Sequence, residues 1–238
     1  MDLIVLASGL GSRLKKINKN RPKCLLKINN KTILDYTAKI FDKFNKVYIV
    51  GGYKYRLLKR FENKNIKIVI NKDFRTTNMV HSLFKVKNKI SSSVIVIYAD
   101  ILFDQSIINL INKKTSNTIA LKKNWLKVWK TRMSTNKILN DAEDVKFNRS
   151  KIITIGGKLK NYPKAQYMGI IKFKKKGYYS AMAYYKKISN KKIDMTTFIN
   201  EMIKNNILTF NYILTNKFWY EIDTPLDLKN FKKMKIKL

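Results

Sequence analysis

The chain contains very little cysteine, histidine or proline. Of its 238 residues, one is a cysteine (Cys24), one is a histidine (His81) and three are prolines. A single cysteine excludes an internal disulfide framework and is typical of proteins in a reducing compartment. No apolar run approaches the roughly 18 residues that a membrane span needs, and the N-terminus, with Asp2 before a strand-like run, does not resemble a signal peptide. We therefore expect a cytoplasmic protein without a membrane span.

Acidic residues are also scarce. There are 15 Asp and Glu residues against 51 Lys and Arg, which gives a formal net charge of +36. Such an excess is found in proteins that bind nucleic acids or membrane surfaces. Here the excess is mostly lysine, spread along the chain, and asparagine and isoleucine are abundant too, as a genome rich in A and T would produce. A selected surface for polyanions stays open as the alternative, but we expect no specific nucleic-acid partner.

Apolar residues, in contrast, are plentiful: 45% of the chain is hydrophobic and 12% is aromatic. That content can form a sizeable core, so we expect a folded chain. Short apolar runs rich in β-branched residues occur at 2–6, 46–50, 66–70 and 94–98, and each reads as a buried strand. The segments between these runs, 33–44, 55–62 and 79–86, carry apolar residues at helical spacing. This alternation predicts an α/β fold, with a mostly parallel central sheet and helices on both faces.

The pattern changes after Asp100. We expect helices at 104–114, 176–188 and 196–205, strands at 118–121, 166–173 and 209–213, and a hairpin of 144–147 with 151–155. No repeat or Pro- and Gly-rich linker divides the chain. The sequence therefore predicts a single domain, 1–238, whose second half adds a small antiparallel elaboration to the same sheet.

The first predicted strand runs into the loop LASGLGSRL at positions 6–14. Ligands of open α/β sheets bind at this carboxyl end of the strands. Gly9 and Gly11 allow a tight turn that brings backbone N–H groups up to phosphate oxygens, and Arg13 adds a cation. A dinucleotide motif would need glycine at Leu14, and no P-loop motif occurs. The remaining match, GxGSR followed by the proline and lysine at 22–23, is typical of nucleotidyltransferases, although a simple βα turn is the alternative.

Carboxylates follow two strand-like runs that are distant in the sequence. Asp100 follows VIVIYA, and Glu221 and Asp223 lie at the end of FWYEI and just after it. Acids at the ends of buried strands are suitable ligands for Mg²⁺ alongside substrate phosphates. For Asp223, the alternative is an N-cap of the helix that starts near Thr224.

A third group of residues combines aromatic and charged side chains. Trp125 and Trp129 are one helical turn apart, Arg132 follows, and acidic residues come next at 141, 143 and 144. Aromatic faces and carboxylates attract a cationic amine, and Arg132 can grip a phosphate or carboxylate. The alternative is that the two tryptophans form an ordinary core stripe.

These segments together resemble a known family. The chain is similar to the cytidylyltransferases related to CTP:phosphocholine cytidylyltransferase, in the sugar-nucleotidyltransferase superfamily, whose relatives act on phosphoglutamine or on phosphonates such as 2-aminoethylphosphonate. The matching segments, in order, are LASGLGSRL with RPKCLLKI, VGGY at 50–53, TNMVHSLF at 77–84, YADILF at 98–103, NWLKVW with DAEDV, AQYMGIIKF at 165–173 and WYEIDTPLDL at 219–228. A proline often found before the DAE is absent here.

The resemblance implies a Rossmann-like nucleotidyltransferase fold and a reaction that couples CMP to a small phosphorylated or phosphonate head group, for decoration of a cell-surface glycan or lipid. It implies Mg²⁺ as cofactor, held by Asp100, Glu221 and Asp223. The catalytic residues would be Lys23, Arg13, Asp100 and Asp223. The residues that would bind CTP are Leu6, Ala7, Ser8, Gly9, Gly11, Ser12, Arg13, Lys23, Gly51, Gly52, Tyr53, Thr77, Asn78, Ser82 and Asp100. Those that would bind the acceptor are Trp125, Trp129, Arg132, Glu143, Tyr167 and Glu221.

The attacking phosphate oxygen is already anionic, because the second pKa of a phosphate ester is about 6. No general base is then needed, so we expect His81 to be a pocket-wall or core residue and Cys24 to be buried and inert. Two other functions stay open: a sugar-1-phosphate nucleotidyltransferase that uses another nucleoside triphosphate, and a non-catalytic, basic nucleic-acid-binding protein. A homodimer also stays open.

Overall fold

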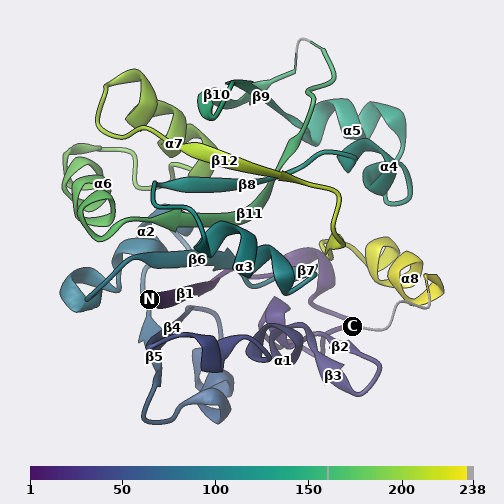
Figure 1. Ribbon diagram of the computed structural model, residues 1–238. Helices are drawn as coiled ribbons and strands as arrows, with labels where there is room; N and C mark the ends of the chain where they lie inside the picture. The colour runs from purple at the N-terminus through teal and green to yellow at the C-terminus, as the bar shows by residue number, and fades with distance from the viewer. Residues whose placement is uncertain (160, 235–238) are drawn as a thin grey trace.

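The centre of the computed structural model, which describes residues 1–159 and 161–234, is a nine-stranded mixed sheet (Figure 1). Its strand order is β5-β4-β1-β6-β11-β8-β12-β10-β9. The strands are β1 (Asp2–Ala7), β4 (Lys46–Gly51), β5 (Ile66–Ile70), β6 (Val94–Tyr98), β8 (Thr118–Lys122), β9 (Glu143–Asn148), β10 (Lys151–Lys158), β11 (Gln166–Phe173) and β12 (Asn211–Thr215). Two small antiparallel pairs accompany the sheet: β2 (Lys27–Ile28) with β3 (Lys31–Thr32), and β7 (Ile101–Phe103) with β13 (Trp219–Glu221).

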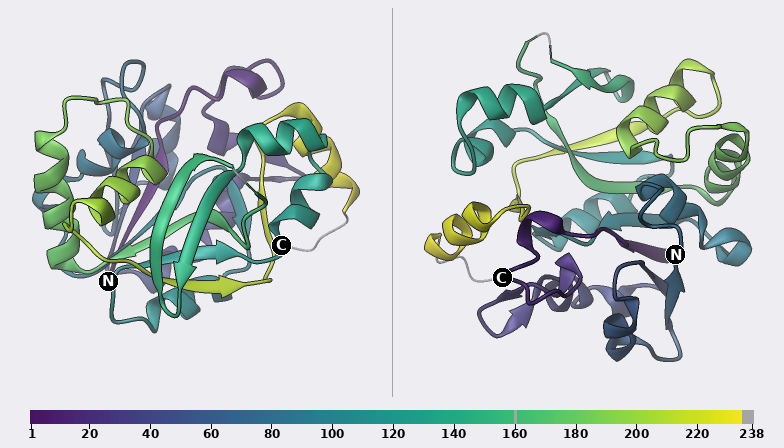
Figure 2. Two further views of the ribbon diagram at one scale, coloured as in Figure 1. Left: turned by 90° about the horizontal axis from the view of Figure 1, so that it is seen from above. Right: turned by 180° about the vertical axis from the view of Figure 1, so that it is seen from behind.

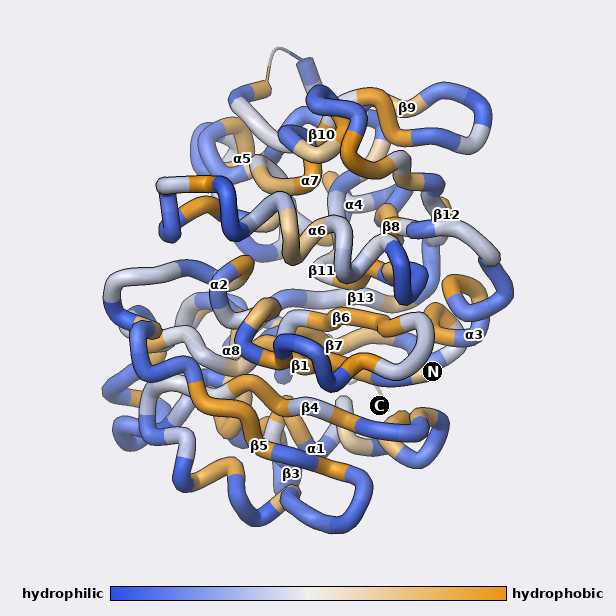
Figure 3. The backbone as a smooth tube through the Cα atoms, turned by 90° about the vertical axis from the view of Figure 1, so that its left-hand side faces the viewer, coloured by the Kyte–Doolittle hydropathy of each residue, from blue (hydrophilic) through white to orange (hydrophobic). Residues whose placement is uncertain are grey.

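The first half of the chain builds the parallel part of the sheet. Strands β5, β4, β1 and β6 are parallel neighbours, and the register places Leu6 beside both Val50 and Tyr98. Strand β1 is buried along its whole length, because helices cover both faces of a parallel sheet. Figure 3 shows β1 and β6 as hydrophobic stretches at the centre of the molecule. All four predicted strands are present, although β5 is an edge strand in which only Val69 is buried, because no strand covers its outer side. The loops that follow the four strands open at one edge of the sheet.

Helices cover both faces of the sheet (Figures 1 and 2). The hydrophobic cluster on one face includes α2 (Met79–Phe84), α6 (Lys175–Lys187) and α7 (Met195–Lys204). The cluster on the other face includes α1 (Ile33–Ala38), α3 (Ser106–Asn112), α4 (Trp125–Lys130) and α5 (Thr135–Asp141). The last helix, α8 (Pro225–Lys233), packs with the β2 and β3 region in a third, smaller cluster.

The second half adds the antiparallel strands that the sequence predicts. Strand β11 runs antiparallel to both β6 and β8, and β9 and β10 form the expected hairpin. The α/β fold class is therefore confirmed. Two predicted helices differ: the segment 33–44 divides into α1 and a 3₁₀ turn at Phe41–Lys43, and Tyr55–Phe61 is a 3₁₀ helix. In the described part of the chain, every helix is too short or too polar to cross a membrane.

Candidate active site

Three carboxylates from two distant parts of the chain meet at the carboxyl edge of the sheet. Asp100 follows β6, and Glu221 and Asp223 lie at and just beyond the end of β13. Because β7 pairs with β13 and places Ile101 opposite Glu221, the two segments are held side by side. One carboxylate oxygen from each of the three residues lies within 4.8 Å of the other two. The three predicted metal ligands therefore form one cluster.

The ammonium group of Lys23 lies against this cluster. Its Nζ donates a hydrogen bond of 2.6 Å to Asp100 Oδ2 and another to Asp223 Oδ1. Burial alone would lower the pKa of Lys23, but the charges of Asp100, Asp223 and Glu221 outweigh burial and raise the pKa above its usual value. Lys23 is therefore a fixed cation at the position where the glycine loop meets the carboxylates.

Arg132 approaches the same carboxylates from inside the protein. It is buried, and its guanidinium lies 3.0 Å from Asp227 Oδ1, 3.3 Å from Glu221 Oε2 and 3.6 Å from Asp223 Oδ2. The prediction that Arg132 binds the acceptor is therefore wrong for this structure, because its donors face internal carboxylates. Its role is to neutralise and orient them.

Asp227 fixes the backbone around Asp223. Its Oδ2 accepts hydrogen bonds from the N–H groups of Asp223 and Thr224, at 2.9 and 2.8 Å. Thr224 is the N-cap of α8, and its hydroxyl accepts from the N–H of Asp227 to complete a capping box. The alternative role of Asp223 as the N-cap is therefore wrong, and its carboxylate is available to the cluster.

The carboxylate cluster fits a hard divalent cation. With Asp227 included, four carboxylates face two basic side chains, Lys23 and Arg132, which leaves two negative charges when all are ionised. Burial and the neighbouring Asp223 and Asp100 raise the pKa of Glu221 to about 8. Asp100 Oδ1 is buried without a hydrogen-bond partner in residues 1–159 and 161–234. Oxygen ligands, excess negative charge and an oxygen without a hydrogen-bond partner suit a hard divalent cation.

A cavity of about 150 Å³ opens on one side of the carboxylates. We call it the nucleoside cavity. It is lined by Leu6, Ser8, Gly9, Phe74, Thr77, Asn78, Met79, Ser82, Tyr98 and Asp100. Seven of these ten were in the predicted CTP set. Sequence reasoning missed Phe74, Met79 and Tyr98, although Tyr98 ends the strand that leads to Asp100.

Several other predicted CTP residues lie around this cavity rather than on its wall. Gly52 packs so closely that an added Cβ would lie 2.7 Å from the carbonyl oxygen of Ser8. Tyr53 contacts Phe74, with 6.5 Å between ring centroids. Gly52 therefore allows the loop after β4 to approach the glycine loop, and Tyr53 supports the wall formed by Phe74. A direct contact between either residue and CTP stays a prediction, as it does for Gly51.

The glycine loop itself is shaped to meet Lys23. Gly11 has a φ of +57°, a conformation that favours glycine, and an added Cβ would lie 2.9 Å from Lys23 Cβ. Ser12 and Arg13 are exposed in the short 3₁₀ turn that follows. The loop thus leaves Arg13 open to solvent, and phosphate contacts by Ala7, Gly11, Ser12 and Arg13 stay predictions.

A second cavity, of about 190 Å³, opens on the other side of the carboxylates. We call it the acceptor cavity. It is lined by Met79, Tyr98, Ile101, Trp129, Asp141, Glu143, Gln166, Tyr167, Met168, Gly169, Asp194, Met195, Thr196, Trp219 and Glu221. Four residues predicted to bind the acceptor, Trp129, Glu143, Tyr167 and Glu221, are on this wall. Asp194, Thr196 and Trp219 were missed, since they come from segments distant in the sequence.

Trp125 is a core residue instead. It is 2% exposed, its Nε1 donates a hydrogen bond of 2.9 Å to the carbonyl of Pro163, and its ring packs edge-to-face on Trp129 at 5.3 Å. The predicted contact of Trp125 with the acceptor is therefore wrong for this structure. The two tryptophans lie one turn apart on the same face of α4 and contact each other, and only Trp129 reaches the cavity wall.

The acceptor cavity is acidic in a very basic chain. Asp141, Glu143, Asp194 and Glu221 line it, and no Lys, Arg or His residue of the described chain does. The hydroxyl of Thr196 donates to Glu143 at 2.7 Å and is 2.9 Å from Asp194. Burial raises the pKa of Glu143, although the hydrogen bond from Thr196 opposes this shift. The wall therefore offers negative charge and aromatic faces, which together favour a cationic group.

The carboxylate cluster lies where the two cavities meet. Both cavities are lined by Met79 and Tyr98, Asp100 faces the nucleoside cavity, and Glu221 faces the acceptor cavity. A nucleotide and a second small substrate can therefore bind on opposite sides of one set of carboxylates. This arrangement suits group transfer between two bound molecules.

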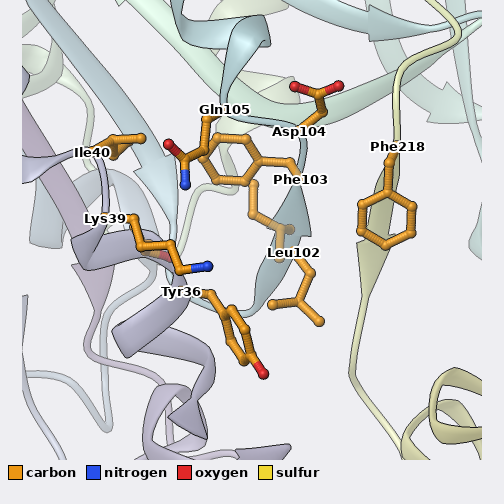
Figure 4. Close-up of a pocket in the computed structure, with 10 residues that line it drawn as sticks. Tyr36, Lys39, Ile40, Leu102, Phe103, Asp104, Gln105 and Phe218 are labelled. Carbon is orange, nitrogen blue, oxygen red and sulfur yellow. The ribbon is translucent and has the colours of Figure 1, made fainter. Parts of the chain in front are cut away.

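A larger cavity, of about 340 Å³, lies away from these residues (Figure 4). Its wall includes Tyr36 of α1, Lys39 just after that helix, Phe103 of β7, and Phe218. It contains none of the predicted site residues, and Ile101 is the one residue that it shares with the acceptor cavity. Cavity size is therefore not what identifies the reaction site in this fold.

The single histidine and the single cysteine take no part in either cavity. His81 is partly buried, with Nδ1 2.8 Å from the hydroxyl of Tyr185 and Nε2 3.3 Å from Asp73. Cys24 is buried, and burial raises the pKa of its thiol to about 12. Cys24 is therefore buried, as the sequence predicts, and its inertness stays a prediction. His81 lies on α2 and bridges Tyr185 and Asp73.

Known proteins that are similar to this chain include nucleotidyltransferases. The family model of the MobA-like NTP transferase domain matches residues 3–124. A CTP:phosphoglutamine cytidylyltransferase from Campylobacter jejuni is 34% identical over 96% of this chain and 98% of that protein. A choline-phosphate cytidylyltransferase from Streptococcus pneumoniae is 29% identical over 48% of this chain and 52% of that protein.

Solved structures share the whole fold. The inositol-1-phosphate CTP transferase from T. maritima superimposes with a TM-score of 0.78, at 19% sequence identity, and the match covers 100% of this chain and 98% of that one. At this level of identity the likeness concerns the fold. It extends through the second half of the chain, beyond the residues matched by the family model.

Proposed function

The chain belongs to the MobA-like NTP transferase family, and on that premise we propose that it is a CTP-dependent cytidylyltransferase. It would transfer CMP from CTP to a small phosphorylated or phosphonate head group that also carries a cationic group, with release of pyrophosphate. The observation that carries this proposal is the cluster of Asp100, Glu221 and Asp223 between a neutral polar cavity and an acidic aromatic one. The family membership supports nucleotidyl transfer, and the cavities support the choice of substrates.

The chemistry needs two bound molecules and charge neutralisation. An oxygen of the acceptor's phosphate or phosphonate attacks the α-phosphorus of CTP, a new P–O bond forms, and the bond to the β-phosphate oxygen breaks as pyrophosphate leaves. The attacking oxygen is anionic at neutral pH, since its pKa is about 6, so no side chain has to remove a proton. The protein therefore contributes position and electrostatic stabilisation.

Basic groups and backbone N–H groups would neutralise the triphosphate. Lys23 is held at the carboxylates by hydrogen bonds to Asp100 and Asp223, next to the turn at Gly11. Arg13 is exposed on the following turn. We propose that both contact phosphates. Asp100, Glu221 and Asp223 would hold Mg²⁺, which when bound supplies positive charge that offsets the negative charge of the reacting phosphates.

The acceptor cavity supports an amine-bearing acceptor. Glu143 and Asp194, bridged by Thr196, offer negative charge, while Trp129 and Tyr167 offer aromatic faces. Cation–π contacts are worth about 0.5–2 kcal/mol each. Phosphocholine, 2-aminoethylphosphonate and phosphoglutamine all combine a phosphorus group with a cationic nitrogen. The C. jejuni relative, which aligns over 96% of this chain, favours the phosphoglutamine-like class.

We further propose that the reaction takes place in the cytoplasm and that its product is a CDP-linked head group. The phosphate of CMP and the phosphate or phosphonate of the head group are joined by a phosphoanhydride, which is an activated linkage suited to later transfer. That transfer would place the head group on a cell-surface glycan or lipid.

A matrix of substrates tests the proposal. The purified chain is incubated with Mg²⁺ and with one nucleoside triphosphate and one acceptor at a time, and pyrophosphate release is measured. The triphosphates are CTP, UTP, ATP, GTP and dTTP. The acceptors are phosphoglutamine, phosphocholine, 2-aminoethylphosphonate and glucose-1-phosphate. The expected result is release with CTP and an amine-bearing acceptor. Release only with glucose-1-phosphate would support the sugar-nucleotidyltransferase alternative, and no release with CTP and any amine-bearing acceptor would overturn the proposal.

The basic surface is tested separately. A nucleic-acid-binding function predicts binding of DNA or RNA that weakens steeply with salt and that survives Asp100→Asn and Asp223→Asn. We expect weak binding without sequence preference, because the net charge of +36 is spread over the chain. Tight, saturable binding together with no pyrophosphate release in the substrate matrix would favour the nucleic-acid alternative.

A further inference from the structure

Asn71 lies directly behind the nucleoside cavity and belongs to none of the sequence motifs described above. It follows β5 and is buried, with 1% of its surface exposed. Its backbone N–H donates a hydrogen bond of 2.8 Å to the carbonyl of Gly51, which holds it at the edge of the sheet. Its side chain contacts two residues that line the cavity, Thr77 and Ser82.

The orientation of the Asn71 amide is fixed by a backbone group. Its Oδ1 accepts a hydrogen bond of 3.0 Å from the N–H of Asp73. The reversed amide would place an NH₂ group against that N–H, and two donors do not pair. The Nδ2 group must therefore face the hydroxyls, where it donates to Ser82 Oγ at 2.9 Å and to Thr77 Oγ1 at 3.2 Å.

This orientation decides which way each hydroxyl proton points. Both hydroxyl oxygens accept from Asn71, so each proton must go elsewhere. The proton of Thr77 goes to the carbonyl of Asp73, at 2.7 Å. For the proton of Ser82, no acceptor is present among the described residues, and Ser82 lines the cavity. Ser82 therefore offers a hydrogen-bond donor to the bound molecule.

We propose that Asn71 is a positioning residue for base selection, which makes Ser82 a donor toward the ring nitrogen N3 of a pyrimidine. In cytosine, N3 carries a lone pair and accepts this hydrogen bond. In uracil, N3 carries a hydrogen, so two donors would face each other in a buried site, and such mismatches discriminate strongly. This inference rests on the proposed function, because it assumes that the cavity binds the base of CTP.

The substitution Asn71→Asp tests the inference with little change of shape. An aspartate still accepts from the N–H of Asp73, but its other oxygen accepts from the hydroxyls instead of donating to them. The Ser82 proton then points to residue 71, and a lone pair faces the base. We expect the ratio of CTP affinity to UTP affinity, measured by calorimetry without acceptor, to fall at least tenfold. The ratio of the two kcat/KM values should fall with it.

Two controls separate this role from a merely structural one. Asn63→Asp makes the same chemical change at an exposed side chain just before β5. The Oδ1 of Asn63 accepts hydrogen bonds from the N–H groups of Asn65 and Ile66, and an aspartate can accept both. This variant should leave the ratio unchanged. Ser82→Ala removes the donor, so it should lower the ratio by itself, and adding Asn71→Asp to it should lower the ratio no further.

The outcomes are distinct. An unchanged ratio in folded Asn71→Asp protein, or equal losses for CTP and UTP, would overturn the inference. If Asn71→Asp does not fold, Ser82→Ala decides: loss of the preference for CTP supports the assigned donor, and its retention refutes it. Failure of the unmodified chain to bind CTP would instead count against the proposed function.

Discussion

The nucleoside cavity and the acceptor cavity adjoin the same carboxylates but are lined by different chemistry. The nucleoside cavity presents hydroxyl and amide groups, from Ser8, Thr77, Asn78 and Ser82. The acceptor cavity presents four carboxylates and several aromatic rings. Neutral hydrogen-bonding groups distinguish ligands by the arrangement of donors and acceptors, whereas a charged aromatic wall distinguishes them by charge. One site therefore combines two kinds of selectivity.

The difference also bears on the net charge of +36. Four of the 15 acidic residues line the acceptor cavity, and two of the remainder, Asp100 and Asp223, complete the carboxylate cluster. Acidic side chains are thus concentrated at the site in a chain where they are otherwise rare. A general basic composition does not produce such a concentration, so the local charge is a property of the site and not of the composition.

The shared carboxylates depend on Arg132, and its removal should have the largest effect. Arg132→Met would leave Asp227, Glu221 and Asp223 without their buried counter-charge. Removing one partner of a buried ion pair costs roughly 3–5 kcal/mol of the free energy of unfolding. Urea denaturation measures this, with Arg21→Met as the matched control at an exposed arginine. A loss below about 1 kcal/mol would show that the carboxylates do not need Arg132.

The second prediction tests whether both cavities serve one reaction. Asp223→Asn keeps the size of the side chain but removes a charge from the cluster. We expect kcat to fall about 10²–10³-fold, as is usual when transition-state charge stabilisation is lost. The affinity for Mn²⁺, measured by electron paramagnetic resonance, should also fall. Asp42→Asn, at an exposed acid, should change neither quantity. Normal turnover in Asp223→Asn would remove the cluster from the mechanism.

The third prediction separates the two cavities. Glu143→Gln removes a charge from the acceptor cavity but keeps an oxygen to accept from Thr196. Charge-assisted hydrogen bonds contribute about 1.5–3 kcal/mol, so KM for an amine-bearing acceptor should rise roughly 10–100-fold, while KM for CTP stays the same. Glu201→Gln, outside both cavities, is the control. Equal changes for both substrates would contradict the division of roles.

The same variant gives a pH test. Burial raises the pKa of Glu143, so this carboxylate takes up a proton at a higher pH than an ordinary glutamate does. The ionised form attracts the cationic group, and KM for the acceptor should therefore rise as the pH falls through the raised pKa. Glu143→Gln should flatten that part of the pH profile. A profile that is identical in the two proteins would exclude Glu143 as its source.

Much of the parallel half could be predicted from the sequence. Strands β1 and β6 are nearly continuous apolar runs, because both faces of the central parallel sheet are buried, and β4 and β5 are rich in β-branched residues. Asp100 could be predicted as a site residue because it directly follows one of these runs. The pairing of β7 with β13 could not be predicted, since it joins short segments far apart in the chain.

The direction in which a side chain faces was decided by the tertiary structure. Trp125 and Trp129 have equivalent sequence signals, yet packing places the first in the core and the second on the acceptor cavity. Arg132 looked like a ligand-binding cation and is an internal counter-ion. Asn71 carried no signal, because its role comes from hydrogen bonds to residues brought near it by folding.

The sequence by itself determined the class of fold, the glycine loop and the acids at the strand ends, because each depends on the local order of residue types. Only the tertiary structure decided which acids share a site, which aromatic rings are exposed to a ligand and which way a hydroxyl donates. These depend on distances between segments that are remote in the chain, and such distances are set when the strands pair and the helices pack.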